Sequence, residues 1–140
     1  FNGDVFNVKS MIPENSIDVI FISNFLEHLD NKAQVIELLN VLRPILKENG
    51  RIMILQPNIR YVGGAYWDFI DHKVPLTEKS LEEAAAGTDY EVVTTIKKFL
   101  PYTTKSKIPK VSWLIRAYLM FMPMSSEVMG KQSFMIMRKK

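Results

Sequence analysis

The sequence has no cysteine among its 140 residues, which excludes disulfide bridges and thiolate metal sites. It also lacks a concentrated run of positive charge, because 18 Lys and Arg are offset by 15 Asp and Glu, for a net charge of +3. Proteins that bind nucleic acid usually carry a basic stripe, so we expect no nucleic-acid partner. A chain without cysteine suits a reducing compartment, and we expect a cytoplasmic location.

No apolar run in the sequence is long enough to cross a membrane. The longest, from Trp113 to Met124, contains Arg116 and falls short of the roughly 20 residues that a spanning helix needs. We therefore expect no transmembrane segment. With 47% apolar and 24% charged residues, the composition is that of one globular domain.

Apolar patterns in the first half predict a strand, a helix and a second strand. Residues 17–22 and 52–55 are short apolar runs, typical of strands covered on both faces. Between them, apolar residues recur at helical spacing from Val35 to Leu46, with Pro44 expected to bend or shorten the last turn and Asn49-Gly50 to end the helix. This order predicts two parallel strands joined by a right-handed crossover.

The second half predicts one more helix and two more strands. Thr77 or Ser80 is placed to cap a helix that ends at Gly87. Residues 91–96 and 133–137 are expected to be strands. The pattern as a whole predicts an α/β domain.

Polar residues follow both strands of the first half. The segment SNFLEHL, Ser23 to Leu29, follows the first strand, and Gln56-Pro57-Asn58 ends the second. Ligands of open α/β sheets bind beyond the carboxyl ends of parallel strands, so the two segments are candidates for one shared site. In the alternative interpretation, Glu27 interacts with the start of a helix and His28 with a nearby carbonyl group.

Several motifs in this order resemble the latter half of a class I S-adenosylmethionine-dependent methyltransferase. They are Gly3-Asp4-Val5, Ile12-Pro13, Ile17-Asp18-Val19 and Glu27-His28-Leu29. A looser resemblance continues through DHKVPLTEKSLEEAAAGTDYEVV to QSFMIMRKK, which is similar to the family's antiparallel last strand. The resemblance implies a partial Rossmann-like methyltransferase sheet, with parallel strands and an antiparallel C-terminal strand, and S-adenosylmethionine as cofactor.

Two cofactor-binding elements of the family are missing from the sequence. These are the glycine-rich loop after the first strand and the acidic residue after the second, and Gly63-Gly64 lies too late in the chain to replace the loop. The first residues, from Phe1, resemble the end of a strand. We therefore expect residues 1–140 to be the C-terminal part of a single methyltransferase domain, inactive alone, with residues 101–129 as a substrate-side insertion.

The resemblance assigns cofactor contacts to Asp4, Val5, Ser23, Asn24, Phe25 and His28. Asp4 would accept from the adenine amine, and its alternative role is to form a turn. His28 is also the candidate general base, because imidazole titrates near neutral pH, and its alternative role is a polar wall residue. Some related methyltransferases hold a divalent ion with a Glu-x-x-Glu-His pattern and a later histidine. Because Asn24 replaces the first of those glutamates, the sequence predicts no metal.

The acceptor pocket is predicted on the aromatic loop after the second strand. Its candidate residues are Tyr61, Tyr66, Trp67 and His72, which alternatively form the hydrophobic underside of the loop. Residues 113–122 have three interpretations: a core helix, a lid, or a patch in peripheral contact with a membrane surface. The first two are favoured, because the segment contains only one basic residue, Arg116.

The sequence therefore predicts methyl transfer from S-adenosylmethionine to a small-molecule or glycan-like acceptor. The alternative is a non-catalytic methyltransferase-like domain that binds a partner through its aromatic insertion. The sequence does not fix the oligomeric state.

Overall fold

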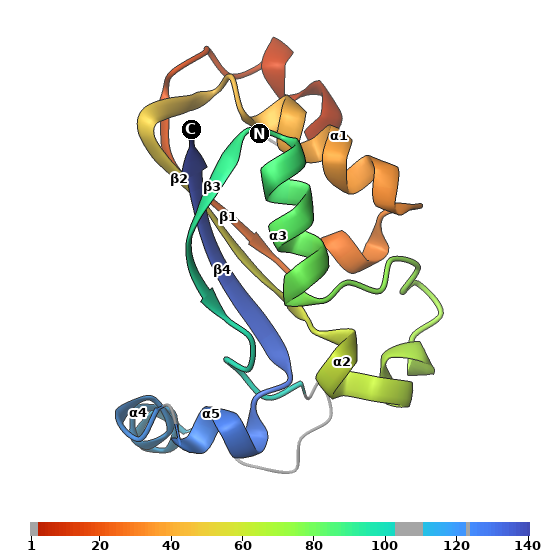
Figure 1. Cartoon of the computed structure of the whole chain (residues 1–140), viewed down its shortest axis with the longest axis vertical. Helices are drawn as coiled ribbons and strands as arrows, with labels where there is room; N and C mark the ends of the chain where they lie inside the picture. The colour runs from red at the N-terminus through yellow and green to blue at the C-terminus, as the bar shows by residue number, and fades with distance from the viewer. Residues whose placement is uncertain (1–2, 103–110, 123) are drawn as a thin grey trace.

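The structure is a computed structural model that describes residues 3–102, 111–122 and 124–140 (Figure 1). Its elements, in chain order, are η1 (Val5–Ser10), β1 (Ile17–Ser23), η2 (Leu26–His28), α1 (Lys32–Leu42), β2 (Leu46–Pro57), α2 (Ile59–Val62), η3 (Gly63–Asp68), α3 (Glu78–Gly87), β3 (Tyr90–Ile96), α4 (Ser112–Met120), α5 (Met124–Met129) and β4 (Gln132–Lys139). Here η marks a 3₁₀ helix. The predicted strands and the helix that begins after Thr77 are all present.

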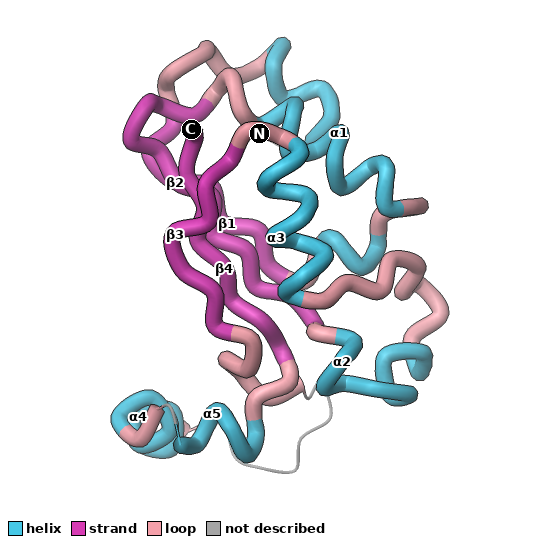
Figure 2. Tube along the Cα trace, viewed as in Figure 1, coloured by secondary structure: helices cyan, strands magenta, loops and turns pink. Residues whose placement is uncertain are grey.

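The four strands form one open sheet in the order β1-β2-β4-β3 (Figure 2). β1 pairs with β2 in parallel, whereas β4 lies between β2 and β3 and runs antiparallel to both. The predicted α/β fold with an antiparallel C-terminal strand is thereby confirmed. Because β1 and β2 are parallel, their carboxyl ends lie at the same edge of the sheet.

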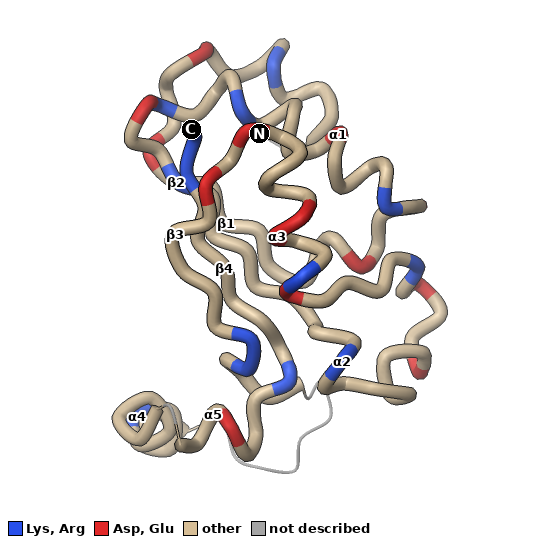
Figure 3. Tube along the Cα trace, viewed as in Figure 1, with Lys and Arg blue, Asp and Glu red and all other residues tan. Residues whose placement is uncertain are grey.

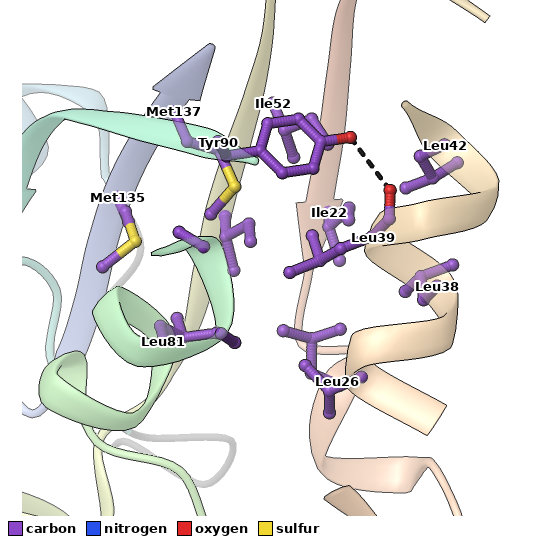
Figure 4. Packing of buried hydrophobic residues seen from close by; sticks show 14 of the residues in the cluster. Ile22, Leu26, Leu38, Leu39, Leu42, Ile52, Leu81, Tyr90, Met135 and Met137 are labelled. Carbon is purple, nitrogen blue, oxygen red and sulfur yellow. Dashed lines mark hydrogen bonds between the residues drawn. The ribbon is translucent and has the colours of Figure 1, made fainter. Parts of the chain in front are cut away.

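α1 and α3 lie side by side on one face of the sheet and enclose the core (Figures 1 and 4). Leu38 and Leu39 of α1, Leu81 of α3 and Ile52 of β2 are fully buried there. The hydroxyl of Tyr90 on β3 donates to the carbonyl oxygen of Leu39 at 2.9 Å, so the far strand is tied to α1 (Figure 4). On the opposite face, β1 exposes the large apolar side chains Val19 and Phe21.

The helix after β1 is shorter than the sequence predicted. α1 ends at Leu42, and β2 already begins at Leu46, before the Asn49-Gly50 pair that was expected to end the helix. Pro44 accounts for the difference, because it has no amide hydrogen to continue the helical hydrogen bonds and its ring clashes with a carbonyl group of the preceding turn. Leu46 is still buried, but as a strand residue rather than on the helix.

α4 and α5 lie together at one end of the molecule, away from α1 and α3 (Figure 1). No residue of α4 is buried, so the interpretation of residues 113–122 as a core helix is wrong. Residues 103–110 and 123, which belong to the predicted 101–129 insertion, lie outside the described residues. None of the described helices is long and apolar enough to span a membrane.

Charged residues of both signs are interspersed along the described chain (Figure 3). Several meet as ion pairs, such as Lys47 with Asp18 at 2.7 Å and Arg138 with Glu91 at 2.8 Å. These side chains are exposed, and exposed pairs contribute at most about 1 kcal/mol each. The burial of apolar residues under α1 and α3 is therefore the larger stabilising contribution.

Leu38 tests this assignment of the core. Leu38 is fully buried, so Leu38→Ala should lower the free energy of unfolding by about 2 to 5 kcal/mol, through lost burial and the cavity left behind. Ile36→Ala on the same helix, at a side chain that is 37% exposed, should cost less than about half as much. Urea unfolding monitored by circular dichroism measures both. Equal losses would contradict the packing of α1 described here.

Candidate functional site

The chain turns sharply where β1 ends. Asn24 has φ of 46°, in the left-handed region that residues other than glycine seldom adopt. Its amide donates to the carbonyl oxygen of Leu55 on β2 at 2.9 Å, so the turn is fixed against the neighbouring strand. Ser23, Asn24 and Phe25 are all exposed there. Strained backbone of this kind is concentrated at functional sites, and here it presents three predicted cofactor residues to solvent.

The turn is followed by η2, which faces the core on one side. Leu26 is fully buried and Glu27 is only 3% exposed. The carbonyl oxygen of Glu27 accepts hydrogen bonds from the amides of Lys73 at 2.8 Å and Val74 at 3.1 Å. These two bonds attach the loop after η3 to the end of β1, although more than forty residues separate the two segments. The structure therefore brings together the predicted strand-end site and part of the predicted acceptor loop.

The attachment places both histidines of the chain next to each other. The rings of His28 and His72 have centroids 5.1 Å apart and meet edge to face at 68°. His28 Nδ1 lies 3.2 Å from the carbonyl oxygen of Asp71 and 3.3 Å from its carboxylate oxygen Oδ2. His72 Nδ1 lies 2.9 Å from the carbonyl oxygen of Tyr66. The alternative role of His28, interaction with a nearby carbonyl group, is thus observed.

Buried polar atoms lie beside the histidines. Glu27 Oε2 and the Tyr102 hydroxyl are both buried and have no hydrogen-bond partner among the described residues. Burial raises the pKa of the Glu27 carboxyl, against the opposing effects of its own backbone amide and of His28. Burial also raises the pKa of Tyr102, with the nearby Glu27 carboxylate adding to the effect. These unpartnered atoms are the kind that a ligand or an ion satisfies.

The predicted acceptor residues have different surroundings. Trp67 is 57% exposed, whereas Tyr66 is fully buried and its hydroxyl donates to the carbonyl oxygen of Val74 at 2.7 Å. Tyr66 therefore supports the loop from within. Tyr61 lies apart from this cluster, where its ring is covered by the Lys98 ammonium group at 5.1 Å. Of the four predicted residues, Trp67 is the exposed one, and His72 is half-buried beside His28.

Two aromatic residues of the site were missed from the sequence. Phe69 stacks on His72 with centroids 4.9 Å apart at 25°, and Tyr102 lies 6.2 Å from Phe69 and 6.5 Å from His72. Phe69 belongs to the aromatic loop already singled out, and its place in that loop was the available signal. Tyr102 follows β3, and nothing in the sequence indicates that it reaches this loop.

Asp4, the residue predicted to contact adenine, does not lie at the carboxyl end of β1. Asp4 precedes η1 and its carboxylate accepts from the Phe6 amide at 3.0 Å, so it caps this short helix. In Figure 1, η1 lies beside the second half of α1, away from the carboxyl end of β1. The turn-forming role of Asp4 is therefore observed, and adenine contacts by Asp4 and Val5 stay predictions.

The second strand end has a structural role. Asn58 is fully buried, and its Nδ2 donates to Glu78 Oε2 at 2.7 Å and to the carbonyl oxygen of Lys97 at 3.2 Å. These bonds join the end of β2 to α3 and to the segment after β3. Gln132 of β4 donates to the Asn24 side-chain oxygen at 3.3 Å, which supports the strained turn from below. Asn58 thus positions the site without facing it.

Comparison of the sequence with protein-family models and with curated proteins gives no match. The fold, by contrast, is similar to that of solved methyltransferases. An S-adenosylmethionine-dependent methyltransferase from Archaeoglobus fulgidus superposes on the whole chain with a TM-score of 0.70 at 23% sequence identity. Geranyl diphosphate C-methyltransferase from Streptomyces coelicolor A3(2) also matches the whole chain, with a TM-score of 0.62 at 12% identity. A Mesorhizobium loti methyltransferase matches 98% of it, with a TM-score of 0.62 at 13% identity.

These matches cover only part of the solved proteins. The chain spans 66% of the Archaeoglobus structure, 67% of the Mesorhizobium structure and 52% of the Streptomyces structure. At such low identities the similarity establishes the architecture. The chain therefore has a partial Rossmann-like methyltransferase fold, as the sequence motifs predicted.

The raised pKa of Glu27 predicts a pH-dependent stability. Because burial lifts the pKa of the folded state above the ordinary value of 4.5, the folded chain keeps a proton that the unfolded chain has released as the pH rises past 4.5. The free energy of unfolding therefore falls with rising pH, and Glu27→Gln should remove this fall. Urea unfolding at a series of pH values, with a chelator present, should show the variant gaining stability relative to the wild type above pH 4.5.

The control is Glu37→Gln on the exposed side of α1, whose pH profile should follow that of the wild type. Parallel profiles for Glu27→Gln and the wild type would contradict the buried state of the Glu27 carboxyl.

Proposed function

We propose that this chain is the carboxyl-terminal part of an enzyme that transfers a methyl group from S-adenosylmethionine to a small-molecule or glycan-like acceptor. The observation that carries the proposal is the exposed, strained turn of Ser23 to Phe25 at the carboxyl end of β1, which leads into η2, where the loop that bears Trp67 and His72 is attached. In open α/β sheets, this edge is where ligands bind. A cytoplasmic location, expected from the sequence, stays a prediction.

The residues at the turn suit one side of the cofactor. Phe25 is 36% exposed, and its ring offers an apolar surface on which an adenine or sugar ring packs. Ser23 is exposed and carries a hydroxyl group for hydrogen bonding. The Asn24 side-chain oxygen already accepts from Gln132 and its backbone amide donates to Leu55, so Asn24 mainly holds the turn in shape. We infer that these residues hold one side of S-adenosylmethionine.

The other side of the cofactor needs residues that this sequence does not contain. The glycine-rich loop and the acidic residue that the family resemblance implies are absent from the 140 residues. We propose that both lie in another part of the same enzyme. The chain alone then provides the acceptor side of the active site and only part of the cofactor site.

The acceptor side is the loop attached to Glu27. Trp67 offers an exposed ring, and Phe69 is half-buried against His72. The Tyr102 hydroxyl is buried without a partner among the described residues, so it is available to a polar group of the acceptor. Aromatic faces together with a few convergent polar atoms are typical of pockets for hydroxylated small molecules and sugars.

The reaction needs alignment more than strong acid or base catalysis. Bound S-adenosylmethionine supplies an electrophilic methyl group on a positively charged sulfur. The contribution of this chain is to hold the acceptor in line with that group and to exclude water, and correct positioning alone is worth several kcal/mol. The exposed His28 is oriented by Asp71, so it lines the site and is available to take a proton from an acceptor hydroxyl group.

A second candidate function is a non-catalytic binding domain. α4 and α5 favour it, because they expose Trp113, Met120 and Met124 by 68%, 74% and 75%. Exposed apolar groups of this density mark surfaces that bind a partner. Cofactor binding by the complete protein separates the two candidates, because the binding domain does not need it.

The first prediction of the proposed function concerns cofactor affinity. Because the chain contains only one side of the cofactor site, we expect it to bind S-adenosylmethionine with a dissociation constant weaker than about 100 μM, whereas the complete protein should bind it at about 10 μM or tighter. Isothermal titration calorimetry on both proteins measures this difference. Tight binding by the chain alone would refute the divided site, and no binding by the complete protein would favour the non-catalytic candidate.

The second prediction concerns the acceptor. Trp67→Ala in the complete enzyme should raise the KM for the acceptor about tenfold, the loss of roughly 1.4 kcal/mol of ring contact, while the affinity for S-adenosylmethionine stays unchanged. Ile70→Ala is the control, since Ile70 lies in the same loop and is fully exposed. Initial rates with an isotope-labelled methyl donor measure the effect. A changed cofactor affinity with an unchanged KM would place Trp67 on the cofactor side.

A further inference from the structure

Three side chains of the site that are able to bind a metal ion lie close together. Glu27, His28 and His72 each contribute one ligand atom, and these atoms all lie within 4.8 Å of one another. They come from η2 and from the loop after η3, which the Glu27 carbonyl oxygen holds together. The cluster is therefore fixed by backbone hydrogen bonds.

The hydrogen bonds of the two rings determine which nitrogen carries the proton. His28 Nδ1 faces two oxygen atoms of Asp71, at 3.2 and 3.3 Å, and His72 Nδ1 faces the carbonyl oxygen of Tyr66 at 2.9 Å. A carbonyl oxygen can only accept, so each Nδ1 must donate. In the neutral rings, Nε2 then carries a lone pair and no hydrogen. Both histidines thus offer an acceptor nitrogen.

Glu27 adds a third acceptor. Its Oε2 is buried and has no hydrogen-bond partner among the described residues, and the residue is only 3% exposed. An unpaired carboxylate oxygen that is shielded from water is costly. A proton on Glu27 would satisfy one of the three acceptors, whereas a cation would satisfy all of them.

We propose that Glu27, His28 and His72 bind a divalent transition-metal ion such as Zn²⁺. An ion among three atoms at these separations would lie at most about 2.8 Å from each, so inward shifts of about 0.6 to 0.8 Å give the bond lengths of roughly 2.0 to 2.2 Å that zinc requires. Imidazole ligands favour zinc, cobalt or nickel over magnesium and calcium, which prefer oxygen ligands. The inference concerns ion binding alone and does not depend on methyl transfer.

The surroundings of the cluster match those of known metal ligands. Histidines that bind metals usually donate their other ring nitrogen to a carbonyl or carboxylate oxygen, as His28 and His72 do here. Asn24, which made a metal site unlikely from the sequence, has its side-chain oxygen bonded to Gln132. The proposed set therefore has three protein ligands, not four. His28 is exposed, so the remaining positions face solvent and are open to water or another ligand.

The test uses the chain without an affinity tag, because its only two histidines then report on the site directly. Long-range ¹H–¹⁵N NMR spectra of the metal-free chain should show Nε2 unprotonated in both rings. Zn²⁺ should shift both Nε2 signals together at one equivalent. Calorimetry should give a dissociation constant of about 1 μM or tighter.

Glu27→Gln and His72→Gln should each weaken Zn²⁺ binding at least tenfold, whereas Glu37→Gln should leave it unchanged. Circular dichroism confirms that each variant is folded, and the NMR titration of the wild type stands even if a variant is not. Several results would overturn the proposal: no binding of Zn²⁺, a shift of the His28 signal alone, or equal affinity in the wild type and Glu27→Gln. The last two outcomes would mean adventitious binding at the surface.

Discussion

The carbonyl oxygen of Glu27 accepts hydrogen bonds from two consecutive backbone amides, those of Lys73 and Val74. The arrangement of the site depends on this attachment of the loop to η2. The side chain of the same residue is buried, and the residue lies one position before His28. The backbone of Glu27 therefore binds the loop, and its carboxylate lies near His72 of that loop. Together with the contact between His28 and Asp71, these bonds set the position of His72 relative to His28, since the two histidines lie on different segments that share no strand or helix.

The rest of the fold keeps the two partners of this attachment in place. On one side, β1 is paired in parallel with β2, and the strained Asn24 is held by Leu55 and Gln132. On the other side, the buried Asn58 joins the end of β2 to α3 and so fixes both ends of the loop between them. The strained turn at Asn24 is thus held by two other strands, β2 and β4, and strained backbone persists only where the surrounding structure supports it in this way.

The sequence was informative wherever a local pattern and the fold agree. Apolar runs located the strands, Thr77 marked the start of α3, and the ordered motifs from Gly3 to Leu29 identified the fold. The sequence was uninformative where a contact between residues far apart in the chain determines the role of a residue. Tyr102 joins the site only because the loop folds back over η2, and Asn58 is a structural residue only because Glu78 meets it. The apolar periodicity predicted a longer helix after β1, but α1 ends early because Pro44 cannot continue the helical hydrogen bonds.

The central claim is that the carboxyl end of β1 forms one side of a cofactor site. The most direct measurement is a ¹H–¹⁵N NMR titration of this chain with S-adenosylhomocysteine at millimolar concentration, where even weak binding is visible. The account predicts that the amide signals of Ser23, Asn24 and Phe25 shift first and together, while those of α4 and α5 stay in place. Shifts confined to α4 and α5, with the β1 end unchanged, would contradict it.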